Sequence, residues 1–318
     1  MPDRWPDLAV LDLLTAVGTT GSLGAAARQV GMAQPNASRA LRGLERDLGL
    51  TLLHRTPRGS SLTPHGLLVA EWSASALEPA RRLTLACEAL RTSSRGQVSV
   101  AASRTVAEYL VPSWLAALRE ERPDVQVLLR VENSSEVCTE VLSGETEVGF
   151  IESEHVPRGL RHTVVDRDEL VVVVAPGHPW ARRRRPLTPV ELAATPLVTR
   201  ERGSGTRETL EARLGRLEPV PLTPAPPALE LGSNDSVRIA VASGAGAAVM
   251  SELAVRESLS TGTLVRVPLA ELVLERRLRA VWTGSGDLRG TGRDLVQVAR
   301  NAGRLRSRRP TPDGAARR

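Results

Sequence analysis

Six residues within the segment 34–42, five polar and one proline, could read DNA. Four of them recur at i, i+3, i+4 and i+7, so they share one face of a helix, and the other two stand at its start. The six are Gln34, Pro35, Asn36, Ser38, Arg39 and Arg42. Amide and hydroxyl groups near a helix N-terminus fit base edges in the major groove, and arginine donates to guanine or phosphate. The pattern predicts a recognition helix for double-stranded DNA. The alternative is a polar helix face turned to solvent.

A short turn further along carries two more arginines. Residues 52–63 predict two short strands around the turn Pro57-Arg58-Gly59. Such a hairpin forms a wing, which would place Arg55 and Arg58 within reach of the DNA backbone or the minor groove.

Three segments that join a predicted strand to a predicted helix are rich in hydrogen-bond donors. Hydroxyls and free backbone N–H groups donate, and the helix dipole favours negative charge. These segments predict a site for a small anion such as a carboxylate, a phosphate or a sulfur oxyanion. The candidates are Ser103, Arg104, Thr105, Asn133, Ser134, Arg202, Ser204, Gly205 and Thr206.

Two of these candidates, Ser103 and Thr206, are expected to face each other across a cleft, with Arg104, Arg200 or Arg202 near enough to assist. The alternative is that the hydroxyls are ordinary helix N-caps. A fourth segment, Ser233-Asn234-Asp235, carries less weight because Asx turns before helices are common.

The sequence lacks the signature residues of several enzyme classes and metal sites. The chain contains no Lys, so a Walker A lysine and a Schiff base are excluded. The five His show no HxH or HExxH spacing, and no GxSxG motif is present. We therefore expect no enzyme, no metal site and no cofactor. Cys87 and Cys138 make no disulfide framework, and no run of 18 apolar residues exists. A reduced, cytoplasmic protein is expected.

The net charge of +6 is concentrated at the C-terminus. Residues 300–318 hold seven Arg against one Asp, so the rest of the chain is balanced. Residues 1–65 hold seven Arg against five acids, which argues against a nonspecific nucleoid protein. Segment 306–318 is expected to be a disordered basic tail that adds only nonspecific attraction to DNA.

The elements that position these residues follow from apolar periodicity. Residues 10–17, 23–30 and 34–48 predict three helices, with Ser22 as an N-cap and a turn at 31–33, which is typical of a helix-turn-helix. Residues 66–92 predict a long helix whose apolar residues, from Val69 to Leu90, are spaced 3 and 4 apart like a seam for a partner helix. The alternative is packing on its own domain. Pro79 lies in the seam and is expected to kink or interrupt the helix.

From residue 97 the pattern alternates between strands and helices. Strands are predicted near 98–102, 125–131 and 147–151, and helices at 106–122 and 135–142. The continuous apolar run 170–175 is typical of a buried parallel strand. This part of the chain predicts a doubly wound α/β fold.

Three segments carry a likeness to a known family: Ser-Leu-Gly-Ala-Ala-Ala-Arg at 22–28, Gln-Pro-Asn-Ala-Ser-Arg-Ala-Leu-Arg-Gly-Leu-Glu at 34–45, and Leu-Thr-Pro-His-Gly at 62–66. In order and spacing they resemble the winged helix-turn-helix of LysR-type transcriptional regulators. The resemblance implies that Gln34, Pro35, Ser38 and Arg39 face the operator and that a wing arginine contacts the DNA backbone. Ala33 stands where the family usually has a Ser or Thr cap, which weakens the helix start by about 1 kcal/mol.

The resemblance continues downstream. The segments 144–149 (Gly-Glu-Thr-Glu-Val-Gly), 175–179 (Ala-Pro-Gly-His-Pro) and 243–247 (Ser-Gly-Ala-Gly-Ala) look like the effector-binding domain of the same family. That domain is similar to periplasmic solute-binding proteins, with two subdomains, crossing strands (here near 166–172 and 264–278) and a ligand cleft between them. The expected domains are a DNA-binding domain at 1–65, a linker and dimerisation helix with its hinge at 66–95, and an effector-binding domain at 96–305. Within the last, subdomain I is expected at 96–168 and 269–305, and subdomain II at 169–268.

The resemblance thus implies a DNA-binding transcriptional regulator whose operator binding is modulated by a small anionic metabolite. Its implied partners are a palindromic double-stranded operator, further copies of the chain in a dimer or tetramer, and RNA polymerase. The alternative is a cytoplasmic solute-binding protein of the same fold without sequence-specific DNA function. The helix-turn-helix and the lack of a signal peptide argue against it.

Overall fold

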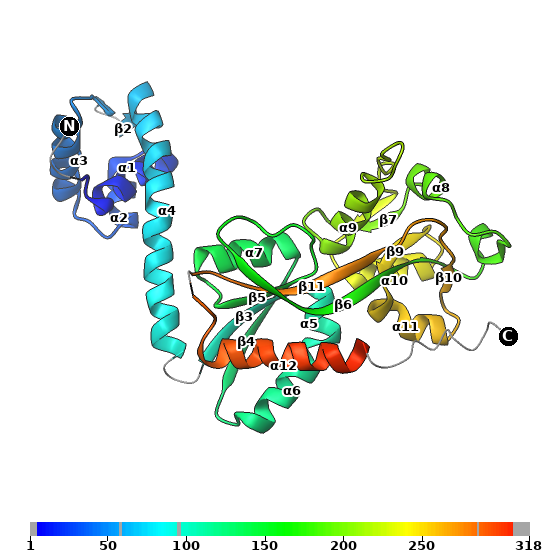
Figure 1. Cartoon of the computed structure of the whole chain (residues 1–318). Helices are drawn as coiled ribbons and strands as arrows, with labels where there is room; N and C mark the ends of the chain where they lie inside the picture. Colours follow the sequence, from blue (N-terminus) through cyan, green and yellow to red (C-terminus); the bar gives the residue numbers. More distant parts are fainter. Residues whose placement is uncertain (1–4, 57–58, 94–96, 285, 308–318) are drawn as a thin grey trace. The chain divides into compact units, whose positions relative to one another are not determined.

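The chain divides into two compact units between Leu85 and Ala86, and the computed structural model describes residues 5–56, 59–93, 97–284 and 286–307. The first unit is a winged helix-turn-helix followed by a long helix (Figure 1). Leu13 and Leu14 of the first helix and Leu41 of the third are fully buried in one core. The elements are α1 (Leu8–Thr20), α2 (Leu23–Gln29), α3 (Gln34–Leu48), β1 (Leu53–Thr56), β2 (Gly59–Leu62) and α4 (Pro64–Ser93).

The starts of α2 and α3 agree with the sequence. The Ser22 side chain accepts a hydrogen bond from the Ala25 N–H, so Ser22 is the N-cap of α2. Ala33 precedes α3 without a side-chain cap, and Pro35 lies in the first turn of the helix, where its missing N–H costs nothing.

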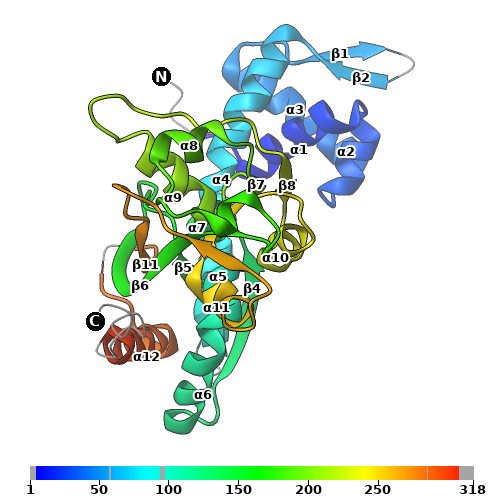
Figure 2. The same ribbon diagram turned by 90° about the vertical axis from the view of Figure 1, so that its right-hand side faces the viewer.

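The wing is an antiparallel hairpin of β1 and β2, in the register Leu53↔Leu62, and it lies beside α1, α2 and α3 (Figure 2). One carboxylate ties it to the recognition helix. Glu45 Oε1 on α3 accepts the backbone N–H groups of Leu52 at 2.8 Å and Leu53 at 3.1 Å. The hairpin is therefore held at a fixed place along α3.

Helix α4 differs from expectation in two ways. It runs without a break through Pro79, because proline removes one backbone hydrogen bond while the bonds of the flanking turns remain. The first residue of the expected seam, Val69, packs into the core of its own unit together with Leu77. Two other members, Trp72 and Leu83, are 65% and 68% exposed. Val69 alone of these seam residues packs on its own unit, while Trp72 and Leu83 leave apolar side chains exposed.

The second unit is built on a mixed sheet in the order β10-β6-β11-β5-β3-β4, with β9 also paired to β6, and on a separate parallel pair, β7 and β8. The strands are β3 (Gln97–Ser103), β4 (Gln126–Glu132), β5 (Val148–Ile151), β6 (Arg161–Val174), β7 (Val198–Arg200), β8 (Leu229–Leu231), β9 (Ala248–Ser251), β10 (Val265–Val267) and β11 (Glu275–Trp282). The helices are α5 (Arg104–Tyr109), α6 (Val111–Glu121), α7 (Ser134–Ser143), the 3₁₀ helix η1 (Pro179–Arg182), α8 (Pro189–Ala194), α9 (Gly205–Leu214), α10 (Asn234–Ala242), α11 (Glu252–Ser260) and α12 (Gly290–Ser307).

Helices cover both faces of each half of this unit. In subdomain I, built on β3, β4 and β5, one core lies under α5, α6 and α12, and a smaller core lies under α7 on the other face. In subdomain II, built on β7 to β10, two further cores lie on opposite faces of β6, where Val172 belongs to one and Val173 to the other. The doubly wound α/β fold is confirmed.

Strand β6 belongs to both subdomains. Its residues up to Glu169 pair antiparallel with β11, and the following residues pair antiparallel with β9 and β10. Figure 1 shows β6 and β11 crossing side by side from one subdomain to the other. The apolar run 170–175 is therefore buried as expected, but the parallel direction predicted for it is wrong. Burial of both faces, which an antiparallel strand can also have, makes the run apolar.

Two element boundaries are corrected. The helix predicted at 106–122 is divided into α5 and α6 at Leu110, because Pro112 must lie in the first turn of a new helix. The first two residues of the expected tail, Arg306 and Ser307, belong to α12, and Arg306 pairs with Asp166 at 3.3 Å. The rest of the tail lies outside the described residues. None of the described helices is both long and apolar enough to cross a membrane.

Candidate DNA-binding face and effector cleft

The polar residues of α3 lie on the face opposite its buried residues. Ala37, Leu41 and Leu44 point into the core, while five of the six candidates are exposed and Ser38 is half-buried. Two hydrogen bonds between neighbouring side chains orient the arginines on this face. Arg39 Nη2 donates to Asn36 Oδ1 at 2.7 Å, and Arg42 Nη2 donates to Ser38 Oγ at 3.1 Å. Both guanidinium groups keep further donors for an outside acceptor.

A groove of about 630 Å³ continues this face toward the C-terminal end of α3. Arg39, Arg42 and Arg46 line it, together with Glu45 and residues 49–51. Three arginines against one carboxylate make the groove basic. The wing arginines cannot be placed in the same way: the Arg55 backbone pairs with Ser60 in the hairpin, and Arg58 lies outside the described residues.

The three effector segments are brought together by the sheet and by contacts between the subdomains. Ser103 and Glu132 are paired in register at the ends of the parallel strands β3 and β4. The segments 103–105 and 133–134 therefore leave the sheet at neighbouring positions. The loop before α9 meets them from subdomain II, where the Ser135 N–H donates to the Gly203 carbonyl at 3.2 Å. Added Cβ atoms would lie 2.9 Å from Asn133 Oδ1 at Gly203 and 2.5 Å from Glu152 at Gly205, so this approach requires glycine.

Capping explains only part of the donor set. Asn133 forms a capping box with Glu136, so for this residue the capping alternative is correct. Ser103 and Ser204 also stand at N-cap positions, of α5 and α9, yet neither makes a capping hydrogen bond. Both hydroxyls are buried without a hydrogen-bond partner, as is the Nε of Arg104. Capping therefore does not account for Ser103 or Ser204.

Further contacts close the two subdomains on each other. Asn234 of α10 donates to Glu108 Oε2 at 2.9 Å and to Thr105 Oγ1 at 3.4 Å, and it accepts from Arg200 Nη1 at 2.7 Å. Burial raises the pKa of Glu108 despite the hydrogen bond from Asn234. The Ser233-Asn234-Asp235 segment, which the sequence ranked low, thus joins the two sides of the cleft.

A buried arginine lies beneath the cleft. Arg276 of β11 is 1% exposed, and its Nη2 lies 2.7 Å from Asp168 Oδ2 and 3.1 Å from Glu152 Oε2. Burial by itself would lower the pKa of this arginine, but the charges of Glu152 and Asp168 raise it. Arg276 Nη1 donates to Thr206 Oγ1 at 3.0 Å, so the Thr206 hydroxyl is left to donate elsewhere.

The expectation that Ser103 and Thr206 face each other across the cleft stays a prediction. Within the described part of the chain no hydrogen bond joins these two residues, because Thr206 is held by Arg276 and Ser103 has no partner. Ser134 Oγ accepts from the Glu152 N–H at 3.3 Å, and Arg202 is exposed. Arg276, Glu152 and Asp168 were not found from the sequence. One signal was present: in the alternating run 274–280, Arg276 shares the inward face with Leu274, Leu278 and Ala280.

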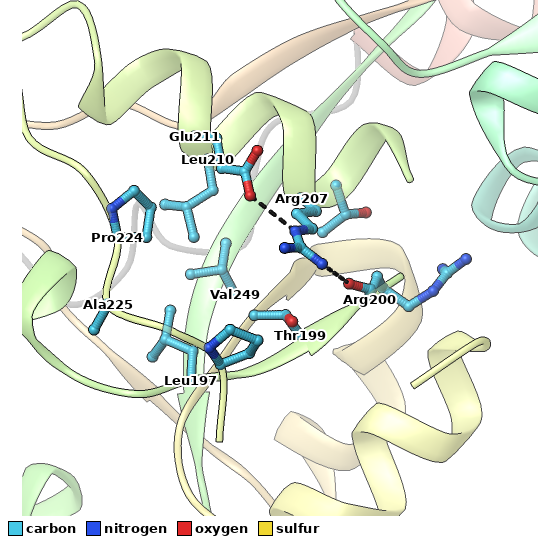
Figure 3. Close-up of a pocket in the computed structure, with 11 residues that line it drawn as sticks. Leu197, Thr199, Arg200, Arg207, Leu210, Glu211, Pro224, Ala225 and Val249 are labelled. Carbon is cyan, nitrogen blue, oxygen red and sulfur yellow. Dashed lines mark hydrogen bonds and ion pairs between the residues drawn. The ribbon is translucent and has the colours of Figure 1, made fainter. Parts of the chain in front are cut away.

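Beside this cleft, subdomain II contains a small cavity of about 40 Å³ (Figure 3). Most of its lining is apolar, including Leu197, Leu210 and Val249. Arg207 reaches its edge, where it is held by Glu211 at 2.8 Å and by the Arg200 carbonyl at 3.3 Å (Figure 3). Arg207, which directly follows Thr206, thus has a structural role. Among the described residues, no group of His, Cys, Asp and Glu could hold a metal ion.

Comparison with known proteins defines the family. Residues 8–67 match the family described as bacterial regulatory helix-turn-helix protein, lysR family, and residues 91–304 match the LysR substrate binding domain. An HTH-type transcriptional regulator of Mycobacterium tuberculosis is 45% identical over 89% of this chain and 93% of its own length. The chain belongs to the LysR family of DNA-binding transcriptional regulators, with an N-terminal helix-turn-helix and a C-terminal effector-binding domain.

Two solved structures show a similar fold. OxyR of Corynebacterium glutamicum is 22% identical, with a TM-score of 0.57 over 95% of this chain and 93% of its own. The regulatory domain of CcmR from Synechocystis, in complex with 2-PG, is also 22% identical, with a TM-score of 0.57 over 65% of this chain and 97% of its own.

Proposed function

We propose that this regulator binds a small anionic metabolite through Ser103, Arg104 and Ser204, and that the bound anion modulates its affinity for a palindromic operator. The observation that carries the effector class is the set of buried donors without acceptors: Ser103 Oγ, Ser204 Oγ and Arg104 Nε. A buried donor without a partner costs about 1–3 kcal/mol, which an anion between these groups would recover.

Two carboxylates of the cleft, Glu201 and Glu208, accept hydrogen bonds within the chain, whereas Glu152 forms an ion pair with Arg276 and its Oε2 accepts no hydrogen bond from the described residues. Glu208 accepts from the hydroxyls of Ser135 and Ser153, and Glu201 accepts from Arg200 at 2.7 Å and 2.8 Å. The nearest carboxylate to Arg104 Nε, Glu201, is 3.8 Å away, which is too far for a hydrogen bond. The free donors therefore need an acceptor from outside the chain.

For the DNA, we propose that the six residues of α3 read base edges and phosphates and that Arg55 and Arg58 assist from the wing. The exposed row on α3 supports this assignment. We propose that α4 joins two copies of the chain, because Trp72 and Leu83 expose apolar side chains that a partner helix would cover. Two-fold symmetry then matches a palindromic site. We retain the domain bounds 1–65, 66–95 and 96–305 as part of this proposal.

Modulation requires that the effector bind one arrangement of the protein better than another. Ser103 and Arg104 belong to subdomain I and Ser204 to subdomain II, and β6 and β11 connect the two. An anion held by donors from both sides stabilises their closed arrangement. We propose that this arrangement sets the operator affinity of the full chain.

The test is calorimetry of the full chain with organic acids, phosphorylated sugars and sulfur oxyanions. Ser103→Ala and Ser204→Ala each remove one hydroxyl donor and should cost about 1.5–3 kcal/mol of binding to an anion. Ser260→Ala, at the exposed end of α11, is the matched control and should bind as the wild type does. Binding of neutral compounds alone would contradict the effector class. An anion that binds both variants unchanged would show that these hydroxyls are not ligands.

A further inference from the structure

The exposed face of the two crossing strands carries an unusual pairing of charges. Arg277 on β11 lies directly opposite Arg167 on β6, and Glu275 lies opposite Glu169. Like charges directly opposite each other destabilise a sheet unless other groups neutralise them. Three of these four residues form an ion pair with an opposite charge: Arg167 pairs with Glu275 at 2.6 Å, and Glu169 pairs with Arg266 at 2.5 Å.

The fourth residue, Arg277, has no carboxylate. Across the described ranges, no ion pair or hydrogen bond involves its guanidinium, and its side chain is exposed. Its charge acts on the next arginine of the same face: the pKa of Arg279 is lowered, first by burial and then by the charge of Arg277. This edge of β11 therefore carries positive charge that the described side chains do not neutralise.

A cavity of about 230 Å³ lies where these side chains meet α9. Its lining is Arg167, Arg213, Val273, Glu275, Arg276 and Arg277. Arg213 of α9 uses Nη2 for Glu154 at 2.6 Å and for the Glu275 carbonyl at 2.8 Å, while its Nε is buried without a hydrogen-bond partner. The one carboxylate of the lining, Glu275, is already held by Arg167.

We propose that this cavity, the crossing-strand pocket, is a second binding site, for a small oxyanion such as a phosphate or a phosphoryl group. The pocket offers the free guanidinium of Arg277 and the free Nε of Arg213, and guanidinium forks match phosphate oxygens. Its volume is below the range of pockets that hold drug-sized ligands, so a compact anion fits best. The site is distinct from the cleft, whose free donors are Ser103, Arg104 and Ser204.

The pocket lies where a bound anion would contact both crossing strands and α9. Arg167 and Arg277 belong to the two crossing strands, and Arg213 belongs to subdomain II. Arg276, which also lines the pocket, donates to Thr206 at the cleft. An anion here ties α9 to both crossing strands and so opposes rearrangement of the subdomains.

The test uses inorganic phosphate and the full chain at low ionic strength, with binding followed by calorimetry. We expect saturable binding that Arg277→Gln weakens by about tenfold or more, because it removes a charged donor. Arg277→Lys keeps the charge without the fork and should bind with intermediate affinity. Circular dichroism should show all variants folded, since Arg277 is exposed and has no protein partner to lose.

Two controls locate the phosphate. Arg119→Gln replaces an exposed arginine of α6 and should bind as the wild type does. Ser204→Ala removes a donor of the cleft and therefore reports any phosphate that binds there instead. If Arg277→Gln binds phosphate like the wild type, or if no saturable binding occurs, the crossing-strand pocket is not an anion site. Loss of binding in Ser204→Ala alone would place the phosphate in the cleft and would also overturn the proposal.

Discussion

Replacement of Arg276 by methionine tests how much the buried ion cluster beneath the cleft contributes to the stability of the folded chain. Methionine has a similar length but no charge, so the variant leaves Glu152 and Asp168 buried at 1% and 5% exposure without their cation. Breaking a buried ion pair by removing one partner costs about 3–5 kcal/mol. Arg276 serves two carboxylates and also donates to Thr206, so we expect the upper part of that range.

The assay is urea unfolding of the full chain followed by circular dichroism, with the midpoint and slope fitted for each variant. The matched variant replaces all three charges: Arg276→Met with Glu152→Leu and Asp168→Leu. Exchange of a complete buried cluster for apolar residues is often neutral or stabilising, so this triple variant should recover most of the loss. A loss below about 1 kcal/mol in Arg276→Met, or no recovery in the triple variant, would refute the reasoning.

Three other predictions concern separate parts of the chain. Arg39→Ala should cost about 1–3 kcal/mol of specific operator binding and leave folding intact; an unchanged gel-shift titration would contradict the placement of the recognition helix. Leu83→Arg puts a charge on the exposed apolar face of α4 and should give monomers in light scattering, whereas the wild-type mass would place the dimer contact elsewhere. Burial raises the pKa of Glu147 from 4.5, so the folded state loses stability as the pH rises above that value. Glu147→Gln should therefore unfold at higher urea than the wild type near pH 7, and the difference should shrink at about pH 4; a difference independent of pH would exclude this cause.

Local patterns predicted the DNA-binding unit well, because its contacts are close in sequence. The spacing of Ala37, Leu41 and Leu44 identified the buried face of α3, and the polar residues between them had to face outward. The turn residues Pro57-Arg58-Gly59 predicted the hairpin of the wing. Pro79 does not interrupt the helix, because one proline costs a hydrogen bond without necessarily ending a long helix, and a kink at Pro79 stays a prediction.

The effector site could be predicted only in part, for the opposite reason. Its donor loops could be predicted from the sequence, because each loop follows a predicted strand and precedes a predicted helix. The cluster under them was not, since Glu152, Asp168 and Arg276 are joined across up to 124 residues and no local period connects them. The direction of β6 was also hidden, because apolar composition reports the burial of a strand and not the direction of its neighbours.

The central claim is that the exposed face of α3 reads a specific, two-fold symmetric DNA sequence. Its most direct test is selection of bound duplexes from a random pool by the full chain, followed by sequencing. We predict enrichment of two inverted half-sites, and loss of that enrichment in Arg39→Ala while general attraction to DNA persists. A pool that shows no enriched sequence, or the same enriched sequence with Arg39→Ala, would contradict the claim.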